Sequence, residues 1–494
     1  MLGLNKSELN LNNYDLQKNV HLYRQGGLNI AYDVNSGSLH LLDDKTYAFL
    51  AELTDLQKAD PALLENGEKL LNTAGCSLEA DEKEEIVQEL AELQKADILF
   101  SREAEEVNPD YPERPLIKAM CLHVAHDCNL RCHYCFAESG SFGGSRGLMS
   151  LDTGKKAIDF LLENSGNRPH CEVDFFGGEP LLNFDVIKEL VRYGRQRAEA
   201  AGKKIKYTLT TNAVLLNDAV AEYLEQEGIS VVLSLDGRPE VNDKMRPFAN
   251  GKGSYDRIID NILKFIAKRP NTSRYAIGKY YYVRGTYTHY NTDFYKDVLH
   301  LADLGINRIS LEPVVAPAEQ SYALQPEDLT QIKQSYDILA EKVLEYARNG
   351  KEFTFFHFNA GLDDGPCLPK RISGCGAGHE YVAVSPEGDI YPCHQFVGQQ
   401  KYKLGSLNDS PVALDNEKVQ SFRQANIYAK EDCRRCWARF SCSGGCHAAN
   451  VAHGGELTKI YPFGCEIQKK RLEIAYYLKI KEKMEQTQRF QTVS

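Results

Sequence analysis

The stretch "HDCNLRCHYCFAESG", residues 126–140, carries three cysteines within eight residues: Cys128, Cys132 and Cys135. It directly follows the apolar run "IKAMCLHVA" (117–125), which predicts a buried strand. Three thiols are one fewer than a closed tetrahedral zinc site uses, and they are an odd number for disulfides. The spacing therefore indicates either a metal cluster with one open position or a zinc site completed by a distant ligand.

Further strand and helix patterns alternate along the chain after this stretch. The strand patterns cover residues 171–176, 205–211, 229–235, 277–283 and 308–313. The helical patterns cover residues 151–164, 185–201, 217–227, 254–268, 291–304 and 325–348. With the strand at 117–125, six strand–helix units in series predict a parallel α/β fold.

Unusual groups follow every predicted strand except the fifth. Parallel α/β folds place reactive residues at the carboxyl ends of their strands. Each group alone is more typical of a turn or a strand end, but all of them in order indicate a site. Their convergence on one rim favours a partial (β/α)6 barrel, because an open sheet would spread them along a line. After the cysteine loop come Gly177-Gly178-Glu179-Pro180, Thr210-Thr211-Asn212, Ser234-Leu235-Asp236-Gly237 and Glu312-Pro313.

The segments on either side of the barrel pattern differ from it in composition. Residues 1–102 predict a winged-helix-like module with a hairpin over 28–42, and residues 103–116 form an acidic, proline-containing linker. The predicted barrel domain covers residues 117–350. A glycine- and cysteine-rich domain over 351–475 has little apolar core of its own, so we expect metal to stabilise it. A helix and tail close the chain at 476–494.

The overall composition is that of a soluble protein, with 43% hydrophobic and 26% charged residues. The net charge of -11 argues against nucleic acid or an anionic membrane as the main partner. No signal peptide or membrane-spanning run is recognisable, so we expect a cytoplasmic protein with reduced thiols. The 14 cysteines, mostly clustered, then indicate metal or redox chemistry. Cys76, Cys121 and Cys171 lie apart from the clusters and are predicted to be buried apolar thiols.

The CxxxCxxC loop, the GGEP motif and the later strand ends together resemble the radical S-adenosylmethionine (SAM) superfamily. The resemblance implies that Cys128, Cys132 and Cys135 bind three irons of a 4Fe-4S cluster whose open iron holds SAM. It implies cleavage of SAM to a 5'-deoxyadenosyl radical that abstracts hydrogen from a substrate. The residues implied to surround SAM are Tyr134, Phe136, Gly177, Gly178, Glu179, Thr211, Asn212, Ser234 and Asp236.

The cysteines between residues 367 and 465 resemble the SPASM domain, which binds two auxiliary 4Fe-4S clusters. The resemblance assigns Cys375, Cys393 and Cys446 to the first cluster, and Cys433, Cys436, Cys442 and Cys465 to the second. Cys367 is a candidate fourth ligand of the first cluster. Without Cys367, that cluster would keep an open iron that a substrate thiolate could occupy. A pair of zinc ribbons is the alternative for this region.

Segments along nearly the whole chain resemble maturases of six-cysteines-in-forty-five (SCIFF) peptides, among them residues 28–50 and 373–399. The resemblance implies thioether crosslinking of a cysteine-rich precursor peptide whose leader binds the N-terminal module as an added strand. It also implies a small electron donor such as flavodoxin or ferredoxin. The alternatives are carbon–carbon crosslinking, formylglycine formation and a non-enzymatic electron carrier, although a carrier needs no SAM site.

His394 marks a departure from a related family. Anaerobic sulfatase-maturing enzymes carry an aspartate base directly after the cysteine of "YPC", whereas this chain has His394 there. An imidazole can act as a base near neutral pH, so His394 is a candidate catalytic residue. The alternative is that His394 shapes the surroundings of the neighbouring cluster.

Overall fold

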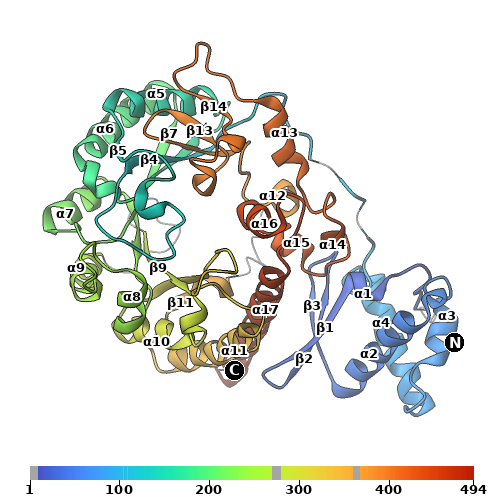
Figure 1. Ribbon diagram of the computed structural model, residues 1–494. Coiled ribbons are helices and arrows are strands. Elements are labelled where there is room, and N and C mark those ends of the chain that lie inside the picture. Colours follow the sequence, from blue (N-terminus) through green and yellow to red (C-terminus); the bar gives the residue numbers. More distant parts are fainter. Residues whose placement is uncertain (1–8, 104, 108, 270–279, 360–367, 494) are drawn as a thin grey trace.

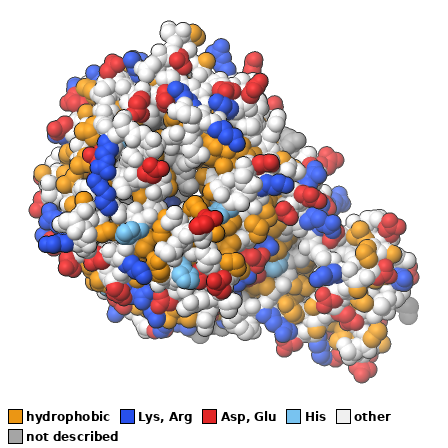
Figure 2. Space-filling model, in the orientation of Figure 1, with side chains coloured by type: hydrophobic (Ala, Val, Ile, Leu, Met, Phe, Trp, Pro, Cys, Tyr) orange, Lys and Arg blue, Asp and Glu red, His pale blue; other side chains and the backbone are white. Residues whose placement is uncertain are grey.

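The computed structural model describes residues 9–103, 105–107, 109–269, 280–359 and 368–493 (Figure 1). It shows a small N-terminal module, a parallel α/β partial barrel and a cysteine-rich region that contacts both. Acidic and basic side chains are interspersed over the face seen in Figure 2. Within the described ranges, no helix is both long enough and apolar enough to cross a membrane.

The N-terminal module, as far as it is described, is built on a three-stranded antiparallel sheet: β1 (Val20–Gln25), β2 (Leu28–Asp33) and β3 (Leu39–Leu42). The predicted hairpin is confirmed as β2 and β3. Phe49 and Leu53 belong to a core separate from that of the barrel. The winged-helix assignment stays a prediction. The helices are α1 (Leu16–Asn19), α2 (Asp44–Ala59), η1 (Pro61–Leu64), α3 (Gly67–Thr73) and α4 (Ala80–Lys95).

The partial barrel is confirmed, and all six predicted strands are present, joined by a short seventh strand, β11, that the sequence did not predict. In the described ranges its parallel strands follow the order β11-β10-β9-β8-β7-β6-β4. The fifth strand was predicted over 277–283, of which 277–279 lie outside the described residues; it extends further than expected, to Tyr287, which adds Arg284 and Thr286 to the barrel wall. The strands are β4 (Ala119–His126), β6 (His170–Gly177), β7 (Lys204–Thr211), β8 (Ser230–Ser234), β9 (Tyr281–Tyr287), β10 (Arg308–Pro313) and β11 (Thr354–Phe355).

Helices cover the outside of the barrel (Figure 1). Along β6, Val173 and Phe175 pack with Leu190 in the main core. Because neighbouring side chains of a strand point to opposite faces, Asp174 and Phe176 face the lumen. The six predicted helices are confirmed as α5 (Leu151–Glu163), α6 (Phe184–Ala200), α7 (Asp218–Gln226), α9 (Tyr255–Ala267), α10 (Tyr295–Asp303) and α11 (Asp328–Arg348).

The cysteine-rich region extends the barrel sheet, which the sequence did not predict. Its strands are β12 (Tyr381–Val384), β13 (Asp389–Tyr391) and β14 (Gly405–Ser406). Strand β12 pairs in parallel with β4, with Ala383 opposite Cys121. Strand β5 (Gly147–Leu148) pairs with the other end of β4. The extension carries Cys393 and His394, which follow β13, to the barrel wall.

The long helix α17 (Pro462–Val493) joins the barrel to the N-terminal module. Its Tyr477 hydroxyl donates to Glu341 of α11 at 2.7 Å. The carbonyl of Glu473 accepts from the Tyr23 hydroxyl of β1 at 3.0 Å. The other helices are η2 (Glu138–Gly140), η3 (Pro180–Asn183), α8 (Pro239–Met245), η4 (His289–Asn291), η5 (Phe356–Phe358), α12 (Leu368–Ser373), η6 (His394–Phe396), η7 (Gln400–Tyr402), α13 (Asn416–Gln424), α14 (Glu431–Arg434), α15 (Arg439–Cys442) and α16 (His447–Gly454).

The N-terminal module also contacts the cysteine-rich region. The ring of His21 in β1 stacks on Trp437 with a centroid distance of 3.8 Å. The buried guanidinium of Arg439 donates to the side chains of Asn19 and Asn35, at 3.0 and 3.1 Å. The module is therefore held against the segment that directly follows Cys436.

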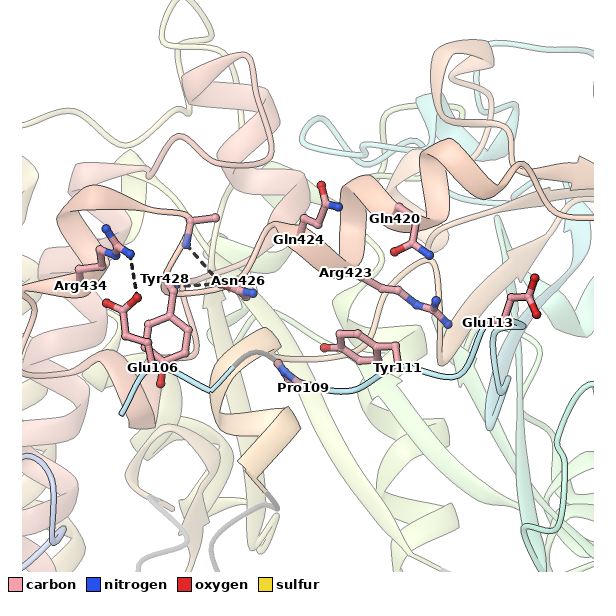
Figure 3. Close-up of a pocket in the computed structure, with 11 residues that line it drawn as sticks. Glu106, Pro109, Tyr111, Glu113, Gln420, Arg423, Gln424, Asn426, Tyr428 and Arg434 are labelled. Atoms are coloured by element: carbon pink, nitrogen blue, oxygen red, sulfur yellow. Dashed lines mark hydrogen bonds and ion pairs between the residues drawn. The ribbon is translucent and has the colours of Figure 1, made fainter. Parts of the chain in front are cut away.

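The predicted linker lies along α13 (Figure 3). Its residues 105–107 and 109–116 contain no helix or strand. Glu106 pairs with Arg434 at 2.7 Å, and the guanidinium of Arg423 lies 5.1 Å from the ring centre of Tyr111. These residues line a cavity of about 540 Å³ between the linker and the cysteine-rich region.

Candidate active site and metal centres

The cysteine loop after β4 is fixed by backbone hydrogen bonds from two sides. The Arg131 amide donates to the carbonyl of Pro247 at 2.8 Å, in the segment after α8. The Glu179 amide, at the end of β6, donates to the carbonyl of Asp127 at 2.8 Å. These bonds hold the loop at the carboxyl ends of the strands, where parallel α/β folds place their reactive groups.

The three thiols of this loop lie close enough for the charge of one to shift the pKa of another. None of them forms a disulfide. Burial raises the pKa of Cys128 to about 11 and the pKa of Cys132 to about 12. Negative charge on Cys135 raises the pKa of both further. Thiols grouped in this way keep their protons unless a positive metal centre binds the thiolates. The donor set therefore fits an iron–sulfur cluster.

No three His, Cys, Asp or Glu side chains among the described residues are arranged to hold a single metal ion. In a 4Fe-4S cluster each thiolate binds its own iron, so the ligands stand further apart than the ligands of one ion. The grouping of Cys128, Cys132 and Cys135 is compatible with such a cluster.

Gly177 and Gly178 allow β6 to approach the cysteine loop closely. A Cβ on Gly177 would lie 2.2 Å from the carbonyl oxygen of Ala125, and one on Gly178 would lie 2.2 Å from that of Asp127. Gly177 also has a φ of 129°, which favours glycine. The glycines are therefore needed for the cysteine loop to pack against the end of β6. Their predicted contact with SAM is a separate proposal.

Glu179 links the ends of β6 and β7 to the first cysteine. Its fully buried carboxylate accepts hydrogen bonds from the Thr211 hydroxyl and the Asn212 amide, both at 2.8 Å. Burial raises the pKa of Glu179 to about 7, while these hydrogen bonds oppose the rise. The side-chain amide of Asn212 in turn donates to the sulfur of Cys128 at 3.6 Å. Three of the predicted SAM residues thus form one network with a cluster cysteine.

Tyr134 of the cysteine loop forms a hydrogen bond with Asp236, which follows β8. The Tyr134 hydroxyl lies 2.7 and 2.9 Å from the two carboxylate oxygens of Asp236 and accepts from Arg246 at 3.1 Å. Burial raises the pKa of Asp236 to about 6, and the nearby Arg246 opposes this rise. Ser234 lies at the end of β8, two residues before Asp236. This contact brings the end of β8 to the same rim.

Phe136 and His394 face each other across the barrel mouth. Phe136 is 50% exposed, and its ring centre lies 5.7 Å from that of His394. The His394 ring lies 5.2 Å from Phe176 of the lumen, and its Nδ1 lies 3.4 Å from the Tyr381 hydroxyl. Burial, followed by the charge of Arg284, lowers the pKa of His394 to about 4. His394 is therefore a neutral imidazole between the cysteine loop and the lumen.

A first group of thiols in the cysteine-rich region contains Cys375, Cys393 and Cys446. Burial raises the pKa of Cys393 to about 12, and the charges of Cys446 and Cys375 raise it further. Cys375 is exposed as a residue, but desolvation of its thiol still raises its pKa, again with a contribution from Cys446. The structure thus brings together the three thiols assigned to the first auxiliary cluster. Cys367, the candidate fourth ligand, lies outside the described residues.

A second group contains the four thiols assigned to the other auxiliary cluster, Cys433, Cys436, Cys442 and Cys465. Burial raises the pKa of Cys433 to about 11 and the pKa of Cys465 to about 12. Charges on Cys442 and Cys436 raise both further. The fourfold sulfur grouping has the donor chemistry of a second iron–sulfur site.

Two sequence expectations have different outcomes. Cys121 and Cys171 are buried as predicted, but the same prediction is wrong for Cys76, which is exposed. Cys76 lies in the loop after α3, where its thiol contacts the Thr73 carbonyl at 3.1 Å.

Glu312 is the last of the predicted rim groups. Its carboxylate pairs with His357 at 3.0 Å.

The lumen contains a group of side chains that the sequence reasoning missed. Cys121 of β4 bonds to the Tyr381 hydroxyl, and both interact with the charge of Asp174. Burial raises the pKa of Asp174 to about 6. The available signal was the alternation in "CEVDFF", which places Asp174 opposite the helix-facing Val173 and Phe175.

Comparison with known proteins agrees with this geometry. A family model of the radical SAM superfamily matches residues 122–284. The barrel of this chain therefore contains a radical SAM domain. A second family model, that of the SPASM iron–sulfur cluster-binding domain, matches residues 375–437. This radical SAM protein is accordingly of the SPASM type, an enzyme that uses SAM and iron–sulfur clusters.

Relatives of this radical SAM protein include maturating enzymes. The cysteine-type anaerobic sulfatase-maturating enzyme of Clostridium perfringens is 25% identical over 389 residues, which cover 73% of this chain and 97% of that enzyme. The mycofactocin maturase MftC of Mycolicibacterium smegmatis is 29% identical over 359 residues, which cover 69% and 81%. The solved structure of native anSMEcpe with bound AdoMet superposes with a TM-score of 0.58 at 21% identity, covering 72% and 97%. That superposition shows the shared fold.

Proposed function

We propose that this radical SAM enzyme installs thioether crosslinks in a cysteine-rich ribosomal precursor peptide of the SCIFF type. Each crosslink joins a cysteine sulfur to a backbone or side-chain carbon. The observation that carries the proposal is the placement of the first SPASM thiol group, through Cys393 and His394, against the lumen and opposite the SAM loop. The similarity to a sulfatase-maturating enzyme supports a peptide or protein as the substrate.

The groups that the enzyme binds supply the radical chemistry, and the chain supplies their placement. Cys128, Cys132 and Cys135 would hold the SAM-binding cluster, and the two SPASM thiol groups would hold the auxiliary clusters. When bound, SAM and the clusters provide a radical that takes one hydrogen atom from the peptide, and an acceptor for the electron released as sulfur bonds to that carbon. Methionine and 5'-deoxyadenosine would be the products formed from SAM. A small donor such as flavodoxin or ferredoxin supplies the initial electron.

Two side chains are placed to take the proton of the reacting thiol. His394 is a neutral imidazole at the barrel mouth, because burial lowers its pKa to about 4. Asp174 faces the lumen, and burial raises its pKa to about 6. His394 directly follows Cys393, and Asp174 and Cys393 both act on the charge of Cys121, so the proposal places the peptide thiol near these two side chains.

The N-terminal module offers a sheet edge for the leader of the precursor peptide. Strand β3 pairs with β2 and ends the described sheet on that side. Its Leu41 is 50% exposed. An edge strand presents backbone donors and acceptors to which an extended peptide can add. The proposal places the leader along β3.

Formylglycine formation is the second candidate function, favoured by the similarity to the sulfatase-maturating enzyme. That reaction removes the sulfur of a cysteine, whereas thioether formation keeps it. The two functions therefore leave different masses and different numbers of free thiols in the peptide.

Mass spectrometry of a cysteine-rich precursor peptide co-expressed with the enzyme tests the proposal. We expect a loss of two hydrogens per crosslink and one cysteine fewer that reacts with an alkylating reagent, because its sulfur has become a thioether.

The matched control is the same peptide co-expressed with an enzyme carrying Cys128→Ala, Cys132→Ala and Cys135→Ala, which should leave the peptide unmodified. Loss of sulfur from the peptide would support formylglycine formation instead. Loss of two hydrogens with every thiol still alkylatable would support carbon–carbon crosslinking. Either result would contradict the thioether proposal.

A further inference from the structure

Lys430 is a buried cation in the SPASM region. Its side chain is 1% exposed, and its Nζ donates to the carbonyl of Gly444 at 2.7 Å. Burial lowers the pKa of Lys430, and the groups that act next most strongly on it are four cysteine thiols rather than carboxylates. A buried ammonium is costly without negative charge nearby, so these thiols are its natural counter-charge.

The loop that receives Lys430 joins the two auxiliary thiol groups. Gly444 stands midway between Cys442 of the second group and Cys446 of the first. Gly444 and Gly445 have φ of 82° and 75°, and their amides bond to the sulfur of Cys442. This conformation turns the Gly444 carbonyl to the ammonium while the amides turn to the thiol. A Cβ on Gly444 would lie 2.9 Å from Nζ, so the loop fits closely around Lys430.

The backbone of Lys430 is also tied to a ligand. Its carbonyl accepts from the amide of Cys433 at 3.0 Å, at the start of α14. The backbone of Lys430 therefore contacts Cys433 of the second group. Its side chain reaches the loop between Cys442 and Cys446. Of the four thiols that act on its charge, three belong to the second group: Cys433, Cys442 and Cys465.

We propose that Lys430 is a shared counter-cation of the two auxiliary clusters and that its ammonium raises the midpoint potentials of both. The proposal rests on the cluster ligands assigned under the proposed function. A fixed positive charge favours the more negative, reduced form of a nearby cluster. We expect the larger effect at the second cluster, because three of its ligands but only Cys446 of the first are among the thiols that act on the charge of Lys430.

An electron paramagnetic resonance titration against redox potential tests this role. The background is the full-length chain with Cys128, Cys132 and Cys135 replaced by alanine, so that only auxiliary clusters contribute. Lys430→Met removes the charge and keeps the length of the side chain. We expect both midpoint potentials to become more negative, with the larger shift at the second cluster. Lys430→Arg keeps the charge and should stay close to the parent, as should Lys401→Met, an exposed lysine of the same region.

Iron and sulfide contents separate the possible failures. Unchanged potentials in a Lys430→Met protein with its full iron content would overturn the proposal. If Lys430→Met loses iron while Lys430→Arg keeps native iron and potentials, the charge is required and the proposal is supported. Equal losses in both variants would show that Lys430 acts through packing and would overturn it. Absence of auxiliary iron from the parent itself would instead refute the ligand assignment of the proposed function.

Discussion

Replacing Cys128, Cys132 and Cys135 together by alanine should abolish the formation of 5'-deoxyadenosine from SAM. These three thiols are grouped on one loop, and no other described group of the chain stands at the carboxyl end of β4 with the same donor chemistry. Without them, SAM has no iron to bind at this rim. We expect the product to fall to the level of a reaction without enzyme, and the iron content to fall by about four per chain.

The control for this triple variant is Cys76→Ala, which removes an exposed thiol of the N-terminal module. It should leave both iron content and product formation unchanged. Product formation that persists in the triple variant would contradict the assignment of the SAM-binding cluster. A loss of nearly all iron from the triple variant would show that the SPASM thiols do not hold clusters independently of the barrel loop.

Replacing Cys433 and Cys465 together by alanine should separate SAM cleavage from crosslinking. Both thiols belong to the second SPASM group, and neither belongs to the network of Glu179, Asn212 and Cys128 at the barrel rim. We expect 5'-deoxyadenosine to form still, because the SAM loop is intact. Thioether product should be lost, because the electron released on carbon–sulfur bond formation has lost its acceptor.

The separation of SAM cleavage from crosslinking is tested by the ratio of crosslinked peptide to 5'-deoxyadenosine. Both are measured in one reaction by mass spectrometry. The 5'-deoxyadenosine signal serves as the internal control that the barrel remains folded. A ratio equal to that of the unsubstituted enzyme would contradict a role of the second SPASM group in crosslinking. Cys171→Ala, a buried thiol of β6 outside the clusters, is a matched control for the loss of a buried sulfur.

The barrel and its rim were largely predictable because their signals are local. Each parallel strand is a short apolar run with a helix after it, and the reactive groups follow directly in the sequence. The structure brings Glu179, Thr211, Asn212 and Asp236 to the cysteine loop as the order of the strands indicated. Sequence alone did not show that the Glu179 carboxylate binds Thr211 and Asn212, since these hydrogen bonds join separate strands.

The extension of the sheet by the SPASM region was not predictable in the same way. Strands β12 and β13 have four and three residues, too few for a recognisable period. The pairing of β12 with β4 joins residues more than 250 positions apart, as in Ala383 opposite Cys121. The position of His394 at the barrel mouth follows from that pairing. The lumen group around Asp174 and the buried Lys430 were missed for the same reason.

The iron and acid-labile sulfide contents of the anaerobically purified and reconstituted enzyme test the central claim most directly. The claim is that one chain holds a SAM-binding cluster in the barrel and two auxiliary clusters in the SPASM region. It predicts about twelve irons and as many sulfides per chain. A content near four, equal to a single cluster, would contradict it.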